Sequence, residues 1–283
     1  MPVSLPPALE LSLDLLCCPT CRMPRLHPEH GALRCPVGHT FDIAHHGYAG
    51  LLTGTRATSG DDAAMVQARD RFLSTGAYAP IRDVGACLAA GAMAEQATVV
   101  DVGCGTGYYL VGVLDQLPGA RGLGLDTSVR ALRSAARAHD RAAAVAWDVF
   151  RPFPLADGVA DVVLNVFAPR NPAEFHRVLR PTGRLIVVRP TGRHLAELRG
   201  RVSAMVTVDP AKEQRLHRAL DPYFEAAVTE QVEYPAILAS PDALDLVVMT
   251  PSARHIGRAD LNDEGLLPDQ VTVSVLATAY RPR

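Results

Sequence analysis

Short apolar runs separated by turn residues recur through the middle of the chain. Each run is four to seven residues long, a pattern typical of strands buried inside a sheet. Two longer apolar segments near the end of the chain predict an antiparallel pair. The seven expected strands cover residues 97–102, 122–125, 143–147, 161–167, 185–188, 225–238 and 271–280. Together they predict an α/β protein built on one seven-stranded sheet.

The segments around these runs predict a helix, a linker and a turn. Residues 61–73 (DDAAMVQARDRFL) have helical spacing, with Asp61 or Asp62 as the N-cap. Before them, residues 47–60 (GYAGLLTGTRATSG) are rich in glycine, serine and threonine and predict a linker. Residues 179–183 (LRPTG) predict a break in the chain before the next strand begins.

The composition is that of an ordinary globular α/β protein. Of the 283 residues, 48% are apolar and 20% charged, enough for one large domain with a small addition. No apolar run approaches the roughly 18 residues that cross a bilayer. The N-terminus carries Glu10 and Asp14 without a basic leader, so we expect no signal peptide and no membrane partner, and a cytoplasmic location.

Arginine is concentrated in one part of the chain. The formal net charge is −2, which gives no general argument for nucleic acid. Between Arg170 and Arg201, however, eight arginines stand against Glu174 and Glu197, a local balance of +6. Guanidinium groups suit phosphate contacts and stacking on bases. These arginines either contact an RNA backbone or solvate a surface, because a high-GC genome also favours arginine codons.

Four of the six cysteines fall within the first 35 residues. Cys18 and Cys21 form a C-x2-C knuckle, and Cys35 and His39 follow as C-x3-H. Three thiolates and one imidazole satisfy tetrahedral zinc, so the pattern predicts a small structural zinc ribbon that needs its metal to fold. Disulfides are disfavoured in a reducing compartment. Cys17 is an alternative to Cys18, although the C-x3-C spacing that it creates is rarer.

A glycine-rich loop follows the first strand of the sheet. It runs from Asp101 to Tyr108 as DVGCGTGY, with Gly103, Gly105 and Gly107. Glycines at this place let the backbone approach a ligand closely. A dinucleotide fingerprint, G-x-G-x-x-G, requires glycine where Tyr108 stands. The loop instead resembles motif I of the class I methyltransferases, in which the glycines hold the methionine part of S-adenosylmethionine (SAM).

Two acidic residues follow the next two strands. Asp126 ends the second strand, where a carboxylate can accept the ribose hydroxyls of a nucleoside. Asp148 follows the third strand, at the edge where adenine would lie. The simpler alternatives are a helix cap for Asp126 and a solvated turn for Asp148. The order of glycine loop and acids favours SAM binding, with Asp101 as part of the cofactor site.

The fourth strand leads to the place where a methyl acceptor is expected. It ends in Asn165-Val-Phe167, at the carboxyl ends of the parallel strands, where ligands bind in open α/β sheets. Asn165 lies where related enzymes hydrogen-bond a target base, and Phe167 is placed to stack on it. Core packing is the alternative for Phe167.

Several motifs together carry a more specific resemblance. They are the cysteine head, GDDAAMVQARDRFLSTGAYAP (60–80), DVGCGTGYY, NVFAPRNPAEFHRVLRPTG, RHLAEL (193–198) and MTPS (249–252). On these motifs, and over most of its length, the chain resembles the RlmA family of 23S rRNA guanine-N1 methyltransferases. NVFAPRNP is most similar to the branch found in macrolide producers, which includes the tylosin-resistance methyltransferase. Two positions depart from the family: Gly50 replaces an asparagine, and Thr182 replaces the first glycine of a Gly-Gly turn.

The resemblance implies a function and its partners. The enzyme would transfer a methyl group from SAM to N1 of a guanine in hairpin 35 of 23S rRNA. The target is guanine 748, for macrolide resistance of the tylosin type, or the neighbouring guanine 745, for routine ribosome maturation. The resemblance is also compatible with a homodimer.

The resemblance also assigns residues and domains. Residues 1–55 would form a zinc-binding RNA-recognition domain with its linker, and residues 56–283 a SAM-dependent methyltransferase domain. The implied zinc ligands agree with the spacing argument. The resemblance implies SAM contacts at Tyr78, at Thr106 and Gly107 in the glycine loop, and at His194. Spacing alone does not single out Tyr78 or His194.

The expected reaction is an in-line displacement in which guanine N1 attacks the methyl carbon of SAM. The proton on N1 must leave, either to a base or before the attack. No catalytic metal is required, and alignment of the two reactants should supply most of the rate. Two rival functions remain: a small-molecule methyltransferase with the same fold, and a zinc-dependent RNA-binding module without enzymatic activity.

Overall fold

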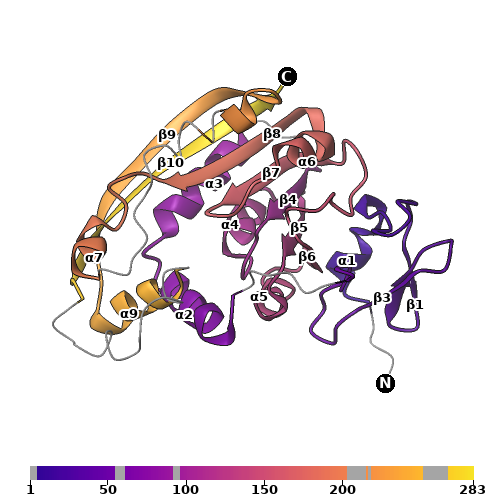
Figure 1. Cartoon of the computed structure of the whole chain (residues 1–283), viewed down its shortest axis with the longest axis horizontal. Coiled ribbons are helices and arrows are strands. Elements are labelled where there is room, and N and C mark those ends of the chain that lie inside the picture. Colours follow the sequence, from indigo (N-terminus) through magenta and orange to yellow (C-terminus); the bar gives the residue numbers. More distant parts are fainter. Residues whose placement is uncertain (1–4, 55–60, 92–95, 203–214, 216–217, 251–266) are drawn as a thin grey trace.

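The computed structural model describes residues 5–54, 61–91, 96–202, 215, 218–250 and 267–283. Its central sheet has seven strands in the order β6-β5-β4-β7-β8-β10-β9 (Figure 1). The strands β4 to β8 are parallel, and β10 is antiparallel to both of its neighbours. The predicted sheet is therefore confirmed. Its strands are β4 Thr98–Val102, β5 Arg121–Asp126, β6 Ala142–Ala146, β7 Ala160–Val166, β8 Leu179–Pro190, β9 Phe224–Ile237 and β10 Gln270–Pro282.

Helices cover both faces of the sheet. Because successive residues of the strands are apolar, each face needs such a cover to be kept from water. In the described part of the chain the helices are α1 Pro7–Glu10, η1 Leu13–Leu15 (a 3-10 helix), α2 Ala63–Ser74, α3 Ala79–Ala90, α4 Tyr108–Gln116, α5 Val129–Ala135, α6 Pro172–Val178, α7 Ala196–Arg201 and α9 Ser240–Val248. On one face, Val99 and Val162 pack with the apolar residues of α3 and α4. On the other, Val100 and Val163 pack with Phe175 of α6. Neighbouring residues thus face opposite sides of the sheet, as successive side chains of a β-strand do.

Two local expectations are settled by hydrogen bonds and strand register. Asp62, and not Asp61, is the N-cap of α2, because its side chain accepts a hydrogen bond from the backbone N–H of Met65 at 2.9 Å. The predicted break at 179–183 does not end a strand, but it coincides with an interruption of the pairing with β7, which passes from Leu179 directly to Arg184. These residues belong to β8, whose pairing with β7 becomes irregular there.

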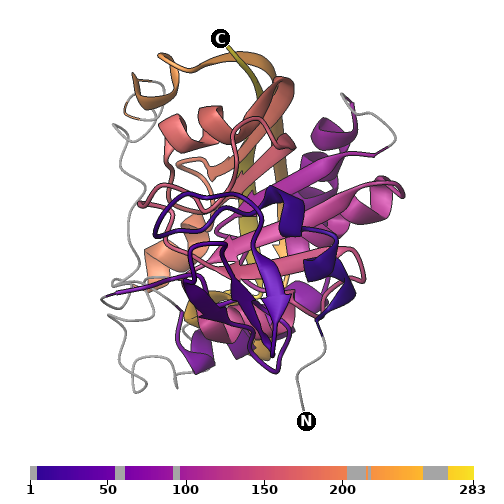
Figure 2. The ribbon, with the colours of Figure 1, turned by 90° about the vertical axis from the view of Figure 1, so that its right-hand side faces the viewer.

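The N-terminal region forms a second, small sheet of three antiparallel strands. These are β1 His27–Glu29, β2 Ala32–Arg34 and β3 Thr40–Asp42, in the order β1-β2-β3. The region lies at the β6 end of the large sheet, with α1 next to β6 (Figure 1). In the view turned by 90°, it stands in front of the large sheet (Figure 2).

The segment after the small sheet is not the linker that its composition predicts. Ala49 is fully buried and forms a bridge with Val145 of β6. Its backbone N–H donates to the carbonyl oxygen of Ala144 at 3.0 Å, and its carbonyl oxygen accepts from Ala146 at 2.8 Å. Ala49 therefore adds an isolated bridge at the edge of the large sheet. Gly47 and Gly50 pack closely against Ala136 and against the backbone of Asp42, so glycine at these two positions does not mark a free tether. Residues 55–60, where we expected the domain boundary, lie outside the described part of the chain.

The two sheets share one hydrophobic cluster. Leu16 and Leu33 of the N-terminal region belong to the same cluster as Leu123 and Phe153 of the larger part. Arg22 adds a hydrogen bond from its guanidinium to the carbonyl oxygen of Phe153, at 2.6 Å. The small sheet is thus fixed against the large one. Among the described helices, none is long and apolar enough to span a membrane.

Candidate active site and metal centre

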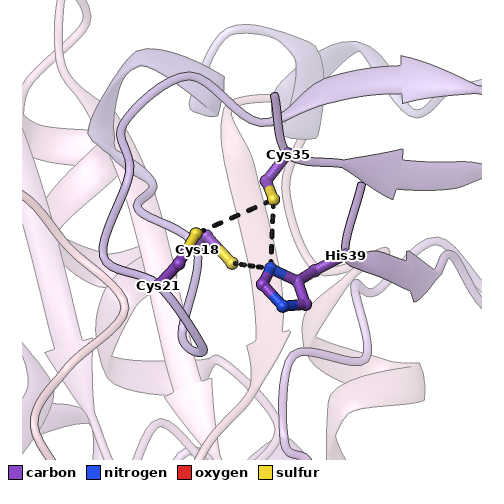
Figure 3. A group of neighbouring side chains, drawn as sticks. All are labelled: Cys18, Cys21, Cys35 and His39. Carbon is purple, nitrogen blue, oxygen red and sulfur yellow. Dashed lines mark hydrogen bonds between the residues drawn. The ribbon is translucent and has the colours of Figure 1, made fainter. Parts of the chain in front are cut away.

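Four metal-ligating side chains come together in the N-terminal region (Figure 3). Cys18 and Cys21 lie in the turn after η1, Cys35 follows β2, and His39 precedes β3. Their three sulfur atoms and one ring nitrogen lie within 4.8 Å of one another. The two Sγ atoms of Cys21 and Cys35 are 3.8 Å apart. Nδ1 of His39 lies 3.6 Å from Sγ of Cys18 and 3.3 Å from Sγ of Cys35.

These separations fit a tetrahedral zinc ion. Zinc bonds of ~2.3 Å to sulfur and ~2.0 Å to nitrogen place two sulfurs about 3.8 Å apart and a sulfur and a nitrogen about 3.5 Å apart. Burial opposes ionisation of Cys35, but N–H donors from His39 and Val37 outweigh it and lower the thiol pKa to about 6, which favours the thiolate. Cys17 is not in the group, so the structure brings Cys18 to the other three ligands.

The glycine loop connects β4 to α4. Gly103 and Gly105 have positive φ angles, 81° and 54°. A Cβ on Gly103 would lie only 2.4 Å from the Cβ of Ala168, so no other residue fits there. A Cβ on Gly105 would meet only the side chain of Arg69, at 3.6 Å. The loop backbone at Gly105 is therefore open to a ligand.

Asp126, the last residue of β5, holds the glycine loop in place. Its Oδ2 accepts a hydrogen bond from the backbone N–H of Gly105 at 2.9 Å, and its Oδ1 accepts one from Ser128 at 2.8 Å. Burial raises the pKa of this carboxyl, and the N–H donors together with Arg69 oppose the rise. Ser128 is the N-cap of α5, so Asp126 is not a helix cap. A carboxylate with two such bonds keeps lone pairs for further donors.

One cavity of about 580 Å³ lies at the carboxyl ends of the parallel strands, a size typical of small-molecule sites. Asp148 reaches it in the turn after β6, where its Oδ1 accepts a hydrogen bond from the backbone of Phe150 at 3.0 Å. The predicted site residues that line this cavity are Tyr78, Gly103, Gly105, Thr106, Asp126, Asp148, Phe167 and His194.

Two predicted cofactor residues do not line the cavity. Asp101 is 1% exposed, beneath the loop, and its Oδ2 has no hydrogen-bond partner in the described part of the chain. Burial, followed by the nearby charge of Asp126, raises its pKa to about 8. A Cβ on Gly107 would lie 3.3 Å from Ala135, so this residue faces α5. Asp101 near the end of β4 and Gly107 at the start of α4 pack against the protein interior. They therefore support the glycine loop on the side away from the cavity.

Tyr78 and His194 meet at the cavity wall, although they are 116 residues apart in sequence. Nε2 of His194 lies 3.2 Å from the hydroxyl oxygen of Tyr78, and Nδ1 accepts a hydrogen bond from the backbone N–H of Ser274 at 3.2 Å. Burial lowers the pKa of His194 to about 4, with a smaller effect from Arg199. The ring is therefore neutral at pH 7, with its proton on Nε2.

Phe167 follows β7 with a positive φ of 53° and is 39% exposed. Its ring stacks on His194, with centroids 5.8 Å apart and planes 27° apart. It therefore lines the cavity and is not part of the core.

Asn165 does not lie where it could contact a target base, contrary to the prediction from the sequence. Its side chain is fully buried, and its Nδ2 donates to the carbonyl oxygens of Val102 at 3.1 Å and Pro169 at 2.8 Å. Both amide protons are thereby used within the protein. Asn165 braces the loop that carries Phe167 and does not line the cavity.

The sequence reasoning missed Arg69, which also lines the cavity. Its guanidinium forms an ion pair with Asp61 and donates to the carbonyl oxygen of Met249 at 2.9 Å. Met65, Arg69 and Leu73 are spaced four apart on α2 and all line the cavity. That spacing places the three residues on one face of the helix, and this pattern could have indicated Arg69 from the sequence.

Part of the arginine-rich stretch is already paired within the fold. Arg177 forms ion pairs with Glu174 and Asp157, both at 2.6 Å. Arg180 pairs with Asp161 at 2.7 Å. These two arginines fasten α6 and the start of β8 to neighbouring segments, so they are poor candidates for phosphate contacts.

The chain matches known proteins in both of its parts. Residues 16–56 match the family model described as "RlmA, N-terminal", a zinc ribbon, and residues 99–183 match a methyltransferase domain. The chain is 44% identical to a putative 23S rRNA (guanine-N(1)-)-methyltransferase from Micromonospora griseorubida, over 95% of this chain and 98% of that protein. This chain belongs to the 23S rRNA (guanine-N1-)-methyltransferase family.

A second relative within the family has a named target. The chain is 43% identical to the 23S rRNA (guanine(748)-N(1))-methyltransferase of Streptomyces fradiae, over 94% of this chain and 96% of that protein. The predicted family, the methyltransferase fold and the zinc ribbon are thus confirmed. The cofactors are SAM and a structural zinc ion. The cavity suits SAM, because the backbone at Gly105 leaves room for the ligand and the carboxylate of Asp126 keeps lone pairs that can accept hydrogen bonds from hydroxyl groups.

Proposed function

We propose that this protein transfers a methyl group from SAM to N1 of guanine 748 in hairpin 35 of 23S rRNA. The observation that carries the proposal is the single cavity in which Asp126, at the end of β5, and Phe167, after β7, both take part. The first suits a nucleoside and the second suits a splayed base, so donor and acceptor would meet there. The identity to the S. fradiae enzyme supports the choice of guanine 748.

The cofactor would lie over the glycine loop. When bound, SAM supplies an electrophilic methyl group on its sulfonium. Asp126 would accept the ribose hydroxyls, and Asp148 would contact the adenine at the β6 side of the cavity. The loop backbone at Gly103, Gly105 and Thr106 would hold the methionine part.

Tyr78 and His194 would complete the cofactor site from the opposite wall. Because His194 donates its only ring proton to Tyr78, the hydroxyl of Tyr78 keeps its own proton for another acceptor. This arrangement suits a polar group of the cofactor, such as the methionine carboxylate. The resemblance first indicated both residues, and their hydrogen bond gives that assignment a physical basis.

The zinc ribbon would recognise RNA. Cys18, Cys21, Cys35 and His39 would ligate the ion and leave no open coordination position, so its role is structural. Because the ribbon shares a hydrophobic cluster with the large sheet, it can hold the RNA in a fixed position relative to the cavity. Exposed residues of the arginine-rich stretch, such as Arg201 of α7, would contact phosphates.

Primer extension on methylated rRNA tests this function. Purified protein, tritiated SAM and unmodified 23S rRNA are combined, and reverse transcription is expected to stop at guanine 748, because N1-methylguanine blocks the Watson–Crick edge. A stop at guanine 745 would assign the neighbouring base. Label in a small metabolite with no label in RNA would support the small-molecule alternative. RNA binding without any transfer would support the non-enzymatic module.

The biological role we propose is resistance to macrolides of the tylosin type, in a cytoplasmic enzyme that acts as a homodimer. Expression in a sensitive host is expected to raise the inhibitory concentration of tylosin only when Asp126 is intact. Light scattering of the purified protein should give the mass of two chains. Unchanged tylosin sensitivity despite full methylation would assign the modification to ribosome maturation.

A further inference from the structure

Apart from the ion pair of Asp61 and Arg69, the charged residues that line the cavity are divided between its two sides. The carboxylates Asp126 and Asp148 follow β5 and β6. On the other side, Arg170 follows β7 and Arg199 follows β8, with the neutral His194 between them in sequence. The strand order changes direction between β4 and β7, so the acidic side is the nucleoside side and the cationic side is left for the acceptor.

Arg170 differs from the other arginines of the cavity in its partners. Arg69 is paired with Asp61, and Arg199 donates to the backbone carbonyl oxygens of His194 and Gly192. Nε of Arg170 is buried without a hydrogen-bond partner among the described residues. A buried donor without an acceptor is costly. Arg170 as a whole is half-buried and lines the cavity, so a ligand there can accept hydrogen bonds from its guanidinium group.

The segment that carries Arg170 is held at both ends. On one side, Asn165 donates to the carbonyl oxygen of Pro169 at 2.8 Å. On the other, Asn171 donates to the carbonyl oxygen of Val149 at 3.0 Å and is the N-cap of α6. Arg170 therefore projects from a braced loop, three residues after the ring of Phe167. Both residues line the same cavity. A fixed cation and an aromatic ring in one cavity are suited to one edge and one face of a planar base.

The acceptor chemistry favours a cation at this place. The lone pair of a neutral guanine N1 is delocalised and N1 carries a proton, so N1 is a poor nucleophile until that proton leaves. Loss of the proton places negative charge on N1 and O6. On the acceptor side, the described lining offers no carboxylate to remove it, whereas arginine is the usual partner of guanine O6 and N7.

We propose that Arg170 is a catalytic residue that donates hydrogen bonds to O6 of the target guanine and stabilises the anion formed when the N1 proton passes to water. The anionic N1 then forms the N–CH3 bond as the S–CH3 bond breaks. The electron pair of that bond stays on sulfur, and S-adenosylhomocysteine leaves neutral. This inference rests on the proposed function, since it assigns a role within the same reaction.

Charged groups around Arg170 must be considered for any pH dependence. Burial lowers the pKa of Arg170, Tyr280 of β10 opposes this, and Arg189 of β8 adds to it. Asp221 in turn lies close enough to Tyr280 to affect its ionisation. A nearby second cation, Arg189, reinforces the stabilisation of an anion at this place.

The test is the single-turnover methylation rate of a hairpin 35 RNA as a function of pH, for wild type, Arg170→Gln and Arg170→Lys, with saturating SAM. At pH 7 the rate of Arg170→Gln is expected to fall about 100-fold, the effect of losing one donor to a developing oxyanion. The rate of this variant should recover as the pH rises, and it should reach its plateau at a pH one to two units higher than the wild type does. Arg170→Lys, which keeps the charge, should lie between the two.

RNA affinity separates this role from a phosphate contact. Dissociation constants, measured with S-adenosylhomocysteine bound, should change less than threefold in Arg170→Gln. Arg281→Gln removes the same charge from an exposed position of β10 outside the cavity and should keep the wild-type pH profile. Weaker RNA binding with a smaller salt dependence and an unshifted pH profile would overturn the inference and make Arg170 a phosphate contact. Wild-type protein that never methylates the hairpin would refute the proposed function instead.

Discussion

Nε2 of His194 lies 3.2 Å from the hydroxyl oxygen of Tyr78, and the two side chains form one wall of the cavity. The backbone N–H of Ser274 fixes the direction of this hydrogen bond, because it can only donate and so keeps the proton of His194 on Nε2. A residue from β10 thus sets the protonation state of a residue that follows β8. The same contact leaves the proton of the Tyr78 hydroxyl available for a ligand.

The neutral state of His194 should make the free energy of unfolding depend on pH. Its pKa is about 4 in the folded chain against 6.5 ordinarily, so between these values the unfolded chain binds the proton and the folded chain does not. The free energy of unfolding should therefore fall as the pH drops from about 6.5 towards 4, by up to about 3 kcal/mol from this residue. Urea unfolding of His194→Gln should give a flatter curve over that range. Parallel curves for variant and wild type would contradict the assignment.

Asp101 should act on stability in the opposite direction. Burial first, and then Asp126, raise its pKa to about 8 from an ordinary 3.8, so the folded chain keeps a proton that the unfolded chain releases. Stability from this group is present at low pH and is lost as the pH rises towards 8. Asp101→Asn mimics the protonated carboxyl, so its stability relative to wild type should grow by a few kcal/mol between pH 5 and pH 8. A difference that stays constant with pH would show that Asp101 ionises normally in the fold.

Zinc content should distinguish the two neighbouring cysteines. Cys18→Ser is expected to lose the metal, whereas Cys17→Ser should keep one zinc per chain, because only Cys18 lies in the group of four ligands. Chelation should lower the melting temperature by on the order of 10 °C, since the ribbon shares its hydrophobic cluster with the large sheet. Metal analysis and thermal unfolding measure both effects. Full zinc occupancy in Cys18→Ser would disprove this ligand set.

Affinity for SAM should depend on Asp126. Asp126→Ala removes the proposed ribose acceptor and also the partner of the Gly105 and Ser128 backbones, so binding should weaken by roughly 1–3 kcal/mol, about 5- to 150-fold. Titration calorimetry with SAM provides the measurement. Asp42→Ala makes the same change at an exposed position of β3 and serves as the matched control. Equal affinities in the two variants would reject the ribose assignment.

Features that are local in sequence were predictable from the sequence. The strands followed from short apolar runs, because burial on both faces of a sheet requires them. The zinc group followed from the spacing of Cys18 and Cys21 and of Cys35 and His39, since each pair of ligands comes from one short turn. The glycine loop likewise followed from its own steric demands at Gly103.

Features that depend on distant contacts were decided only in three dimensions. Asn165 and Asp101 belong to motifs that indicate ligand contacts, yet both are buried, because their neighbours in space come from other strands. Residues 47–54 look like a linker, but Ala49 is buried and forms a bridge with Val145 of β6, a contact that spans almost 100 residues. Tyr78, Arg69 and Arg170 come from separate segments and reach one cavity only after folding. Sequence patterns fix how each segment is built, whereas the direction in which a side chain faces depends on which other segments exclude water around it.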